Sequence, residues 1–195
     1  MPKRGGSLRI VAGELGGRRI RIPERARPTT ERTRGAIFAA LQREPPARVL
    51  DLFAGSGGLG LEALSRGAQF VRMVEQSDRA AAVIARNAQD LDVSDSVMIS
   101  VANALSTDLS LGGPYGLVLA DPPYEFEDWG RLWVNLLRPE VLAEDAVVVI
   151  EHSARVTSPP TPVAWAIWKT RSAGDTAYTF YLRSVSNGVQ SMGLQ

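Results

Sequence analysis

Short apolar runs alternate with amphipathic stretches through the middle of the chain. Five of the runs have the length and composition of β-strands: 48–53, 70–75, 96–100, 116–121 and 146–151. Stretches of helical period lie between them, at about 58–66, 78–91 and 127–138. Strands that are apolar throughout and are joined by helices indicate a parallel sheet covered on both faces. The central part of the chain is therefore predicted to be an α/β fold.

The first part of the chain has a different pattern. Two β-prone runs, 8–12 and 18–22, surround a glycine-rich turn and predict a hairpin. A helix is expected after it. Thr29 or Thr30 can cap the first turn of this helix, which should end at about Arg43 because two prolines follow.

The last part of the chain returns to short strands. The runs 163–169 and 177–184 flank a Ser-Ala-Gly-Asp turn, which predicts an antiparallel hairpin. We therefore expect three parts: a basic hairpin arm over residues 1–28, a main domain over 29–185 and a disordered tail over 186–195.

Composition excludes several classes of protein. The 195 residues are 45% hydrophobic and 22% charged, which suits one folded domain with a sizeable core. The absence of cysteine excludes disulfides, zinc–thiolate sites and thiol catalysis, and no metal site is predicted. No apolar run approaches the roughly 18–20 residues that cross a bilayer, and the first residues lack the apolar segment of a signal peptide. A cytoplasmic monomer without a membrane partner is expected.

Charge is divided unevenly along the chain. Residues 1–48 contain 12 Lys and Arg against 4 Asp and Glu, whereas residues 49–195 contain 10 against 17. Such a division predicts a basic face and a polyanionic partner, for which nucleic acid is the leading candidate. Within the second β-prone run, Arg alternates with Ile, so one strand face is cationic. Arg18, Arg19 and Arg21 are the predicted phosphate contacts, which position a nucleic acid without specifying its sequence.

A glycine-rich turn follows the run at 48–53. Gly55, Gly57 and Gly60 match the spacing of a nucleotide-binding loop between a strand and a helix. Glu75 ends the next strand, where a carboxylate can accept both ribose hydroxyls. Both NAD and S-adenosylmethionine fit this pair. Asp51 favours the second, because it would repel a pyrophosphate but attract a cationic methionine end; alternatively, Asp51 only binds loop amides.

The sequence Asp121-Pro122-Pro123-Tyr124 lies at the carboxyl end of another strand, the sheet edge where ligands bind. It is typical of methyltransferases that act on amino groups conjugated to planar systems, so S-adenosylmethionine becomes the expected cofactor. Such an amine is a poor nucleophile, because its lone pair is delocalised into the ring. The Asp121 carboxylate and the Pro122 carbonyl can accept its N–H groups and favour a pyramidal nitrogen. Tyr124 can stack on an extruded base.

These motifs occur in an order that resembles one family over about residues 8–183: the bacterial 16S rRNA guanine-N2 methyltransferases. The segments that carry the resemblance are RPTTERTRGAIF (27–38), LDLFAGSGGLGLEALSRGA (50–68), VEQSDRAAAVIARN (74–87), VANAL (101–105) and LVLADPPYEF (117–126). The resemblance implies a seven-stranded, Rossmann-like class I methyltransferase sheet with a reversed last strand. It also implies a substrate in 16S rRNA. The small size of the basic arm suggests that this RNA is bound within an assembling small subunit, and naked RNA is the alternative.

The resemblance further assigns roles to individual residues. It implies that Glu75 holds the ribose and that Asn103 lies by the adenine. Asp121 and Tyr124 would receive the guanine. Asp121 would also lie beside the cofactor. Thr30 and Arg34 would close the methionine side of the cofactor pocket, with Arg34 also near the RNA.

Other functions stay open at this point. A DNA adenine-N6 methyltransferase shares the tetrapeptide, but usually needs a target-recognition region for which this chain has no room. A protein-glutamine methyltransferase usually has Asn-Pro-Pro-Tyr and no basic arm. A nicotinamide-dependent oxidoreductase would leave Asp121 to Tyr124 without a role, and a non-catalytic RNA-binding module would not need them.

Several further residues have competing interpretations. His152, the only histidine, is expected to be structural rather than part of a site. Trp129 and Trp133 lie four residues apart on a predicted helix and are expected in the core. The sequence does not decide whether Phe126 lies beside the pocket or away from it.

Overall fold

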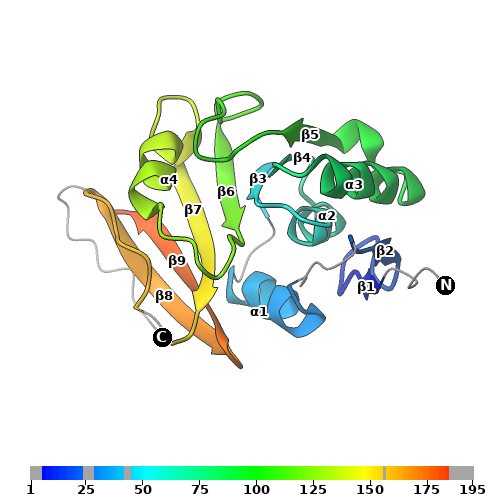
Figure 1. The fold of residues 1–195 in the computed structure, drawn as a ribbon, viewed down its shortest axis with the longest axis horizontal. Coiled ribbons are helices and arrows are strands. Elements are labelled where there is room, and N and C mark those ends of the chain that lie inside the picture. The colour runs from blue at the N-terminus through cyan, green and yellow to red at the C-terminus, as the bar shows by residue number, and fades with distance from the viewer. Residues whose placement is uncertain (1–5, 24–28, 42–44, 156, 185–195) are drawn as a thin grey trace.

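The computed structural model describes residues 6–23, 29–41, 45–155 and 157–184. Its centre is a seven-stranded sheet in the order β5-β4-β3-β6-β7-β9-β8 (Figure 1). The strands are β3 (Arg48–Leu52), β4 (Phe70–Glu75), β5 (Val97–Val101), β6 (Tyr115–Ala120), β7 (Leu142–Ser153), β8 (Trp165–Ala173) and β9 (Thr176–Arg183). β3 to β7 are parallel and β9 is antiparallel to both its neighbours. The predicted α/β sheet with an antiparallel C-terminal hairpin is confirmed.

Four α-helices pack around this sheet. They are α1 (Glu31–Leu41), α2 (Gly58–Ser65), α3 (Asp78–Asp90) and α4 (Trp129–Leu136), with one short 3₁₀ turn at Ser94–Ser96. The predicted positions of all four helices are confirmed. The predicted helix end near Arg43 and the predicted tail over 186–195 lie outside the described residues. Within the described part of the chain, no helix is long and apolar enough to cross a membrane.

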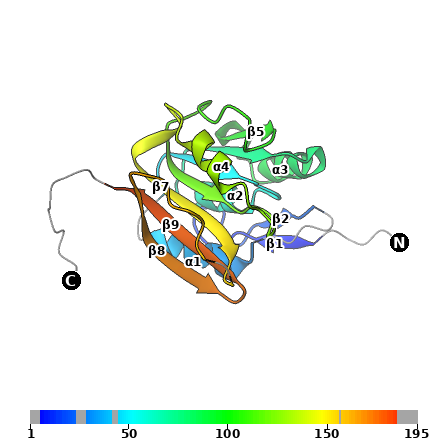
Figure 2. The same cartoon turned by 60° about the vertical axis from the view of Figure 1, so that its left-hand side comes forward.

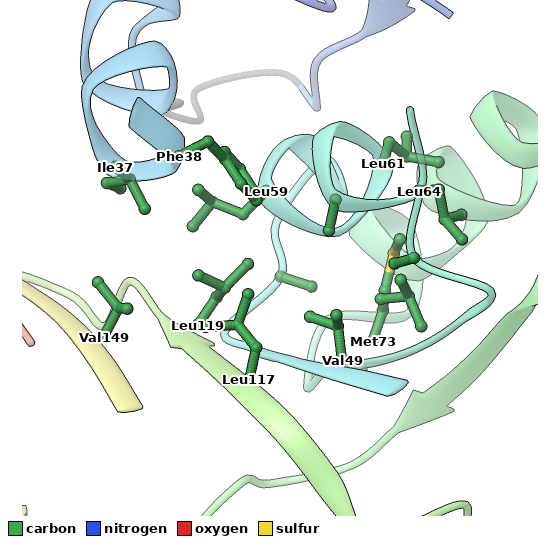
Figure 3. Packing of buried hydrophobic residues seen from close by; sticks show 14 of the residues in the cluster. Ile37, Phe38, Val49, Leu59, Leu61, Leu64, Met73, Leu117, Leu119 and Val149 are labelled. Atoms are coloured by element: carbon green, nitrogen blue, oxygen red, sulfur yellow. The ribbon is translucent and has the colours of Figure 1, made fainter. Parts of the chain in front are cut away.

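Both faces of the sheet are buried, as the apolar strands require. One core cluster joins α1 and α2 to the sheet, and Figure 3 shows Ile37, Phe38 and Leu59 above Leu117 and Val149. The other cluster covers the opposite face, where α4 contributes most of the helical side chains. Successive residues of one strand enter different clusters because side chains alternate across a strand. The sheet edge that carries the carboxyl ends of its strands is thereby fixed between two packed layers.

The N-terminal hairpin consists of β1 (Ser7–Arg9) and β2 (Arg19–Arg21), which pair antiparallel as predicted. It packs on the main domain. The backbone N–H groups of Val11 and Ala12 donate to Glu62 of α2 at 2.8 and 3.2 Å. Ile20 is buried, whereas the arginines on either side of it are exposed. The hairpin therefore presents its cationic side to solvent.

The C-terminal hairpin extends the sheet beyond β7 (Figure 2). β8 is its outer strand, and the pairing of β8 with β9 shifts between Ile167 and Lys169. Ile167 and Trp168 are 45% and 43% exposed. The side-chain ammonium of Lys169 lies 3.4 Å from the centre of the Trp168 ring and donates to the Ala40 carbonyl of α1.

Candidate active site

Two cavities meet at the carboxyl ends of the central strands. The first has a volume of about 450 Å³ and lies against the glycine-rich turn after β3. The second has a volume of about 390 Å³ and lies between the start of α4 and the end of β7. The loop from Asp121 to Tyr124 lines both cavities. Figure 1 shows α1 beside this edge of the sheet.

Asp51 lies at the base of the first cavity, where its side chain is almost fully buried. Its Oδ2 accepts a hydrogen bond of 2.8 Å from the backbone N–H of Gly60. Burial raises the pKa of Asp51 to about 8, and the charges of Asp121 and Glu75 add to the effect. Asp51 therefore binds a loop amide and also lines the cavity. A cation bound there would favour its ionised form.

The three glycines of the turn have different roles. Of these three glycines, only Gly55 lines the cavity. Gly57 has a φ of +77°, and a Cβ there would lie 3.1 Å from the Met73 sulfur. A Cβ on Gly60 would lie 2.6 Å from the terminal methyl of Met73 and 2.9 Å from a Val71 methyl. Gly57 and Gly60 allow α2 to pack closely on β4, and their contact with the cofactor stays a prediction.

Replacing Gly60 by alanine is expected to lower the free energy of unfolding by about 1–3 kcal/mol, because backbone and packed side chains must move to accept the methyl group. Chemical denaturation would measure the change. Gly130→Ala is the matched control. A Cβ at Gly130, within α4, meets nothing within 4 Å, so that change should instead add about 0.4–1 kcal/mol. Equal effects of the two substitutions would contradict this packing role.

Glu75 ends β4 and lines the first cavity, as predicted from its position. Its Oε2 accepts from the N–H of Gly55 at 2.9 Å and its Oε1 accepts from the N–H of Ser77 at 2.8 Å. These two bonds fix the carboxylate in one orientation. Since each carboxylate oxygen has two lone-pair sites, both oxygens retain a site for a further donor.

Asn103 does not line this cavity. It is exposed, and its Oδ1 accepts from the N–H of Leu105 at 2.8 Å in a tight turn. The neighbouring residues Ala102 and Ala104 line the cavity wall instead. In this structure Asn103 forms a turn, and its position beside an adenine, implied by family resemblance, stays a prediction.

Thr29 is the threonine that reaches the site. Its hydroxyl donates to Oδ2 of Asp121, and the residue lines the first cavity. Thr30 instead caps α1, because its hydroxyl oxygen accepts from the N–H of Thr33 at 3.1 Å. Thr29 is therefore the threonine that lines the cavity, and the contact of Thr30 with the cofactor stays a prediction. The sequence offered both threonines as caps but gave no reason to prefer one.

Arg34 is buried and holds this segment in place. Only 1% of its surface is exposed. Its guanidinium donates to the carbonyls of Thr29 and Arg9 at 2.6 and 2.5 Å and lies 3.8 Å from the Glu62 carboxylate. It therefore presents no guanidinium to RNA, and the prediction of an RNA contact is corrected. Arg34 connects the hairpin to the threonine that binds Asp121.

Asp121 and Tyr124 lie on the loop between the cavities. Burial raises the pKa of Asp121, and the hydrogen bond from Thr29 opposes that rise. Pro122 is buried, whereas the side chain of Tyr124 is 63% exposed. The Tyr124 hydroxyl lies 3.4 Å from that of Thr176. The loop thus combines a half-buried acceptor with an open aromatic face.

Aromatic residues form one wall of the second cavity. Phe126 and Trp129 both line it and pack edge to face with centroids 4.6 Å apart. Phe126 therefore flanks a pocket, the alternative that the sequence left undecided. Trp133 belongs to the core as predicted, but Trp129 is only packed against the core and also faces the cavity.

His152 lies in the wall of the second cavity but is fully bonded. One ring nitrogen lies 3.0 Å from the Ser153 carbonyl and the other 2.9 Å from the Thr179 hydroxyl. Burial lowers its pKa, so the neutral ring is favoured at neutral pH. These bonds fit the structural role expected for this residue.

Glu151 is a cavity residue that the sequence did not single out. It follows Ile150, which pairs with Ala120, the residue before Asp121. The two carboxyl groups therefore follow paired positions of adjacent strands. Burial raises the pKa of Glu151 to about 8, and the charge of Asp121 adds to the effect. The sequence places Glu151 at the end of a strand, which is a signal for a site residue. It does not show that this strand pairs with β6.

The predicted phosphate-binding arginines lie on the outer side of the hairpin. Arg19 donates to the Ser7 hydroxyl at 2.9 Å. Arg21 pairs with Asp90 of α3 at 2.8 Å, and Arg18 donates to the carbonyl of Asp90 at 2.6 Å. Arg19 therefore binds a neutral hydroxyl, whereas Arg21 binds a carboxylate and Arg18 binds a backbone carbonyl. The described residues contain no cluster of three or more His, Asp or Glu side chains able to hold a metal ion.

The seven-stranded sheet with one reversed strand, and the two cavities that meet at its carboxyl edge, define a Rossmann-like class I methyltransferase fold. The family model described as conserved hypothetical protein 95 matches residues 8–182. The chain belongs to this family, which is that of ribosomal RNA small subunit methyltransferase D. The family resemblance predicted from the sequence is confirmed.

Individual relatives cover nearly the whole chain. Ribosomal RNA small subunit methyltransferase D of Escherichia coli strain K12 is 34% identical over 184 residues, which are 91% of this chain and 91% of that protein. The solved Escherichia coli protein yhhF has a TM-score of 0.81 at 32% identity, covering 93% of this chain and all of that one. An RNA methyltransferase from Salinibacter ruber, solved with S-adenosyl-L-homocysteine, shares the fold at 16% identity, with a TM-score of 0.64 over 84% of this chain and 98% of that one.

Proposed function

We propose that this chain is an enzyme that transfers a methyl group from S-adenosylmethionine to the exocyclic N2 of one guanine in 16S rRNA. Methylation of small-subunit rRNA follows from its family. The observation that carries the choice of an exocyclic amine is the position of the loop from Asp121 to Tyr124, which lines both cavities. The first cavity would hold the cofactor and the second the extruded base.

The residues of the first cavity fit the cofactor. Glu75 is oriented by two backbone N–H groups and can still accept the ribose hydroxyls. The buried carboxylate of Asp51 suits the cationic methionine end. Ala102, Ala104 and the side chain of Phe53 provide apolar surface for a purine. When bound, the cofactor supplies an electrophilic methyl group on a sulfonium.

The loop between the cavities would position the nucleophile. Asp121 accepts one N–H of the amine, the Pro122 carbonyl accepts the other, and the lone pair is left directed at the first cavity. Tyr124, with its exposed face, would stack on the base. Because the reaction needs an in-line approach, positioning contributes more than proton transfer. No strong base is required, since a methylated cationic amine loses its proton readily.

The natural substrate is proposed to be 16S rRNA within an assembling small subunit. The hairpin is small, with two strands of three residues. A surface of this size positions phosphates but offers little for reading a sequence. Much of the selectivity would therefore come from the shape of the partly assembled particle. The monomeric state and the cytoplasmic location stay predictions.

Replacing Arg18, Arg19 and Arg21 together by glutamine is expected to weaken RNA binding and to reduce the slope of log K against log salt by roughly 2, since about 0.7 counterions are released per single-strand phosphate contact. Binding titrations at several salt concentrations would measure both. Arg131→Gln, an exposed residue of α4, is the control and should leave the slope nearly unchanged. An unchanged slope in the triple variant would move the phosphate site elsewhere.

The proposed function is tested with radiolabelled S-adenosylmethionine and three substrates: naked 16S rRNA, partly assembled small subunits and DNA. Separation of the product nucleosides identifies the methylated base. N2-methylguanine in either RNA substrate is the expected result, with the assembled particle preferred. N6-methyladenine in DNA would overturn the proposed substrate while retaining the role of Asp121. Cofactor binding without methylation of any substrate would favour a non-catalytic RNA-binding protein.

A further inference from the structure

We propose that Glu151 is the residue that selects guanine, by accepting the hydrogen bond of the ring N1–H while Asp121 accepts that of the adjacent N2 amine. This inference rests on the proposed function and adds a specificity-determining residue to it. Glu151 lies outside the loop from Asp121 to Tyr124, on a different strand.

The geometry places two carboxyl groups on one edge of a bound base. Ala120 of β6 pairs with Ile150 of β7, so Asp121 and Glu151 are the next residues on two adjacent parallel strands. Adjacent strands are about 4.8 Å apart. Asp121 and Glu151 both line the second cavity, and only Asp121 also lines the first. Asp121 is therefore placed beside the reacting amine, and Glu151 one position further into the base pocket.

Glu151 has an acceptor available for a ligand. Its Oε2 is buried and has no hydrogen-bond partner among the described residues. A buried acceptor without a partner destabilises a folded protein. A donor from the substrate would remove this cost, so binding of a suitable base would be favoured.

The chemistry of the bases then decides which one fits. Guanine carries a ring N–H next to its exocyclic amine. Adenine has an unprotonated ring nitrogen next to N6, and cytosine has one next to N4, so both would direct a lone pair at Glu151. A carboxylate at this position therefore accepts from guanine and repels the other two amino bases. The loop from Asp121 to Tyr124, which adenine-N6 methyltransferases share, cannot by itself distinguish guanine from adenine.

The surroundings of Glu151 favour its neutral form, and a bound guanine would have to reverse that preference. Asp121 faces it from β6 and Tyr178 lies opposite it on β9. Arg171 lies opposite Tyr178 on β8, and Arg32 of α1 also acts on that tyrosine. The pKa of Glu151 is raised by burial and by Asp121. Donors from guanine would stabilise the ionised form of both carboxylates, whereas the lone pair of adenine would not.

The test compares two RNAs that differ at the nucleotide methylated by the wild-type protein: one carries guanine and the other 2-aminopurine. 2-Aminopurine keeps the N2 amine, but its N1 is an acceptor and O6 is absent. For the wild-type protein we expect 2-aminopurine to be methylated about 10–100 times more slowly. For Glu151→Gln, whose amide can donate to N1, we expect the ratio of the two rates to rise at least about tenfold in favour of 2-aminopurine.

Measuring a ratio within each protein removes any effect of partial unfolding, and the loss of O6 affects every variant equally. Glu127→Gln is the matched control, because Glu127 is an exposed carboxylate that lines the same cavity; its ratio should equal that of the wild type. An unchanged ratio in Glu151→Gln overturns the inference even if overall activity falls. Absence of guanine methylation by the wild-type protein overturns the proposed function itself, and the inference with it.

Discussion

Replacing Asp121 by alanine is expected to reduce the rate of methyl transfer by about 100- to 1,000-fold while largely sparing cofactor binding. The carboxylate is the acceptor that would hold the amine in a pyramidal, reactive geometry, and removing one preorganised polar group of this kind typically has an effect of that size. Asp51 and Glu75, the other two carboxylates of the first cavity, remain in place. Single-turnover methylation with radiolabelled cofactor and calorimetric titration of the cofactor would separate the two effects.

The same substitution should not lower thermal stability through the loss of charge. Burial raises the pKa of Asp121 above its value in the unfolded chain. An acid whose pKa is raised on folding destabilises the folded state at neutral pH, and this cost disappears as the pH falls below the unfolded pKa. Its removal therefore costs no favourable charge interaction. Glu127→Ala is the control for activity, and substantial residual turnover in Asp121→Ala would refute the assigned role.

Replacing Glu62 by alanine is expected to lower the free energy of unfolding by about 3–5 kcal/mol. Glu62 is fully buried and accepts from the N–H groups of Val11 and Ala12 and from Arg66 at 2.8 Å. It also lies beside Arg34, whose pKa burial lowers and the Glu62 charge raises. Without Glu62, the Arg66 guanidinium and two backbone donors lose their acceptor, and the buried Arg34 loses its nearby opposite charge. Chemical denaturation would measure the loss.

Amide hydrogen exchange would show where the structure opens in this variant. Val11 and Ala12 should lose protection first, because their N–H groups bind Glu62 directly. Glu31→Ala is the matched control. It removes an exposed ion pair with Arg9 at 3.4 Å, for which a change of about 0–1 kcal/mol is expected. A loss in Glu62→Ala no larger than in this control would show that the hairpin is held by its apolar contacts alone.

The fold could be predicted from the sequence because its strands are apolar on both faces. The central strands are so consistently apolar that their positions and their parallel direction follow from composition and spacing, whereas their order in the sheet does not. The length of β7 could not be predicted. It extends from Leu142, which pairs with Tyr115, to Ser153, which pairs with Thr176. The polar segment around Glu144 lies within this strand because Leu142, which precedes it, pairs with Tyr115 of β6.

The candidate site was predictable where a motif fixes the backbone and less so where a side chain depends on tertiary packing. Glu75 and Asp121 lie where their strands predict. Neighbouring threonines have the same capping propensity, so only the packed structure distinguishes Thr29 from Thr30. Arg34 has the charge of an RNA contact, but its position in the first turns of α1 directs it into the protein. Glu151 could be found only by knowing which strands are neighbours.

The exposed outer strand β8 has a consequence for self-association. An edge strand presents unpaired backbone groups on which another chain can add, and a flat apolar edge promotes aggregation. Here the shifted pairing between Ile167 and Lys169 bends the edge, and the charges of Lys169 and Arg171 interrupt its exposed apolar residues. Bulges and edge lysines are both known to oppose strand addition. β8 can therefore complete the sheet without offering a template for amyloid-like growth.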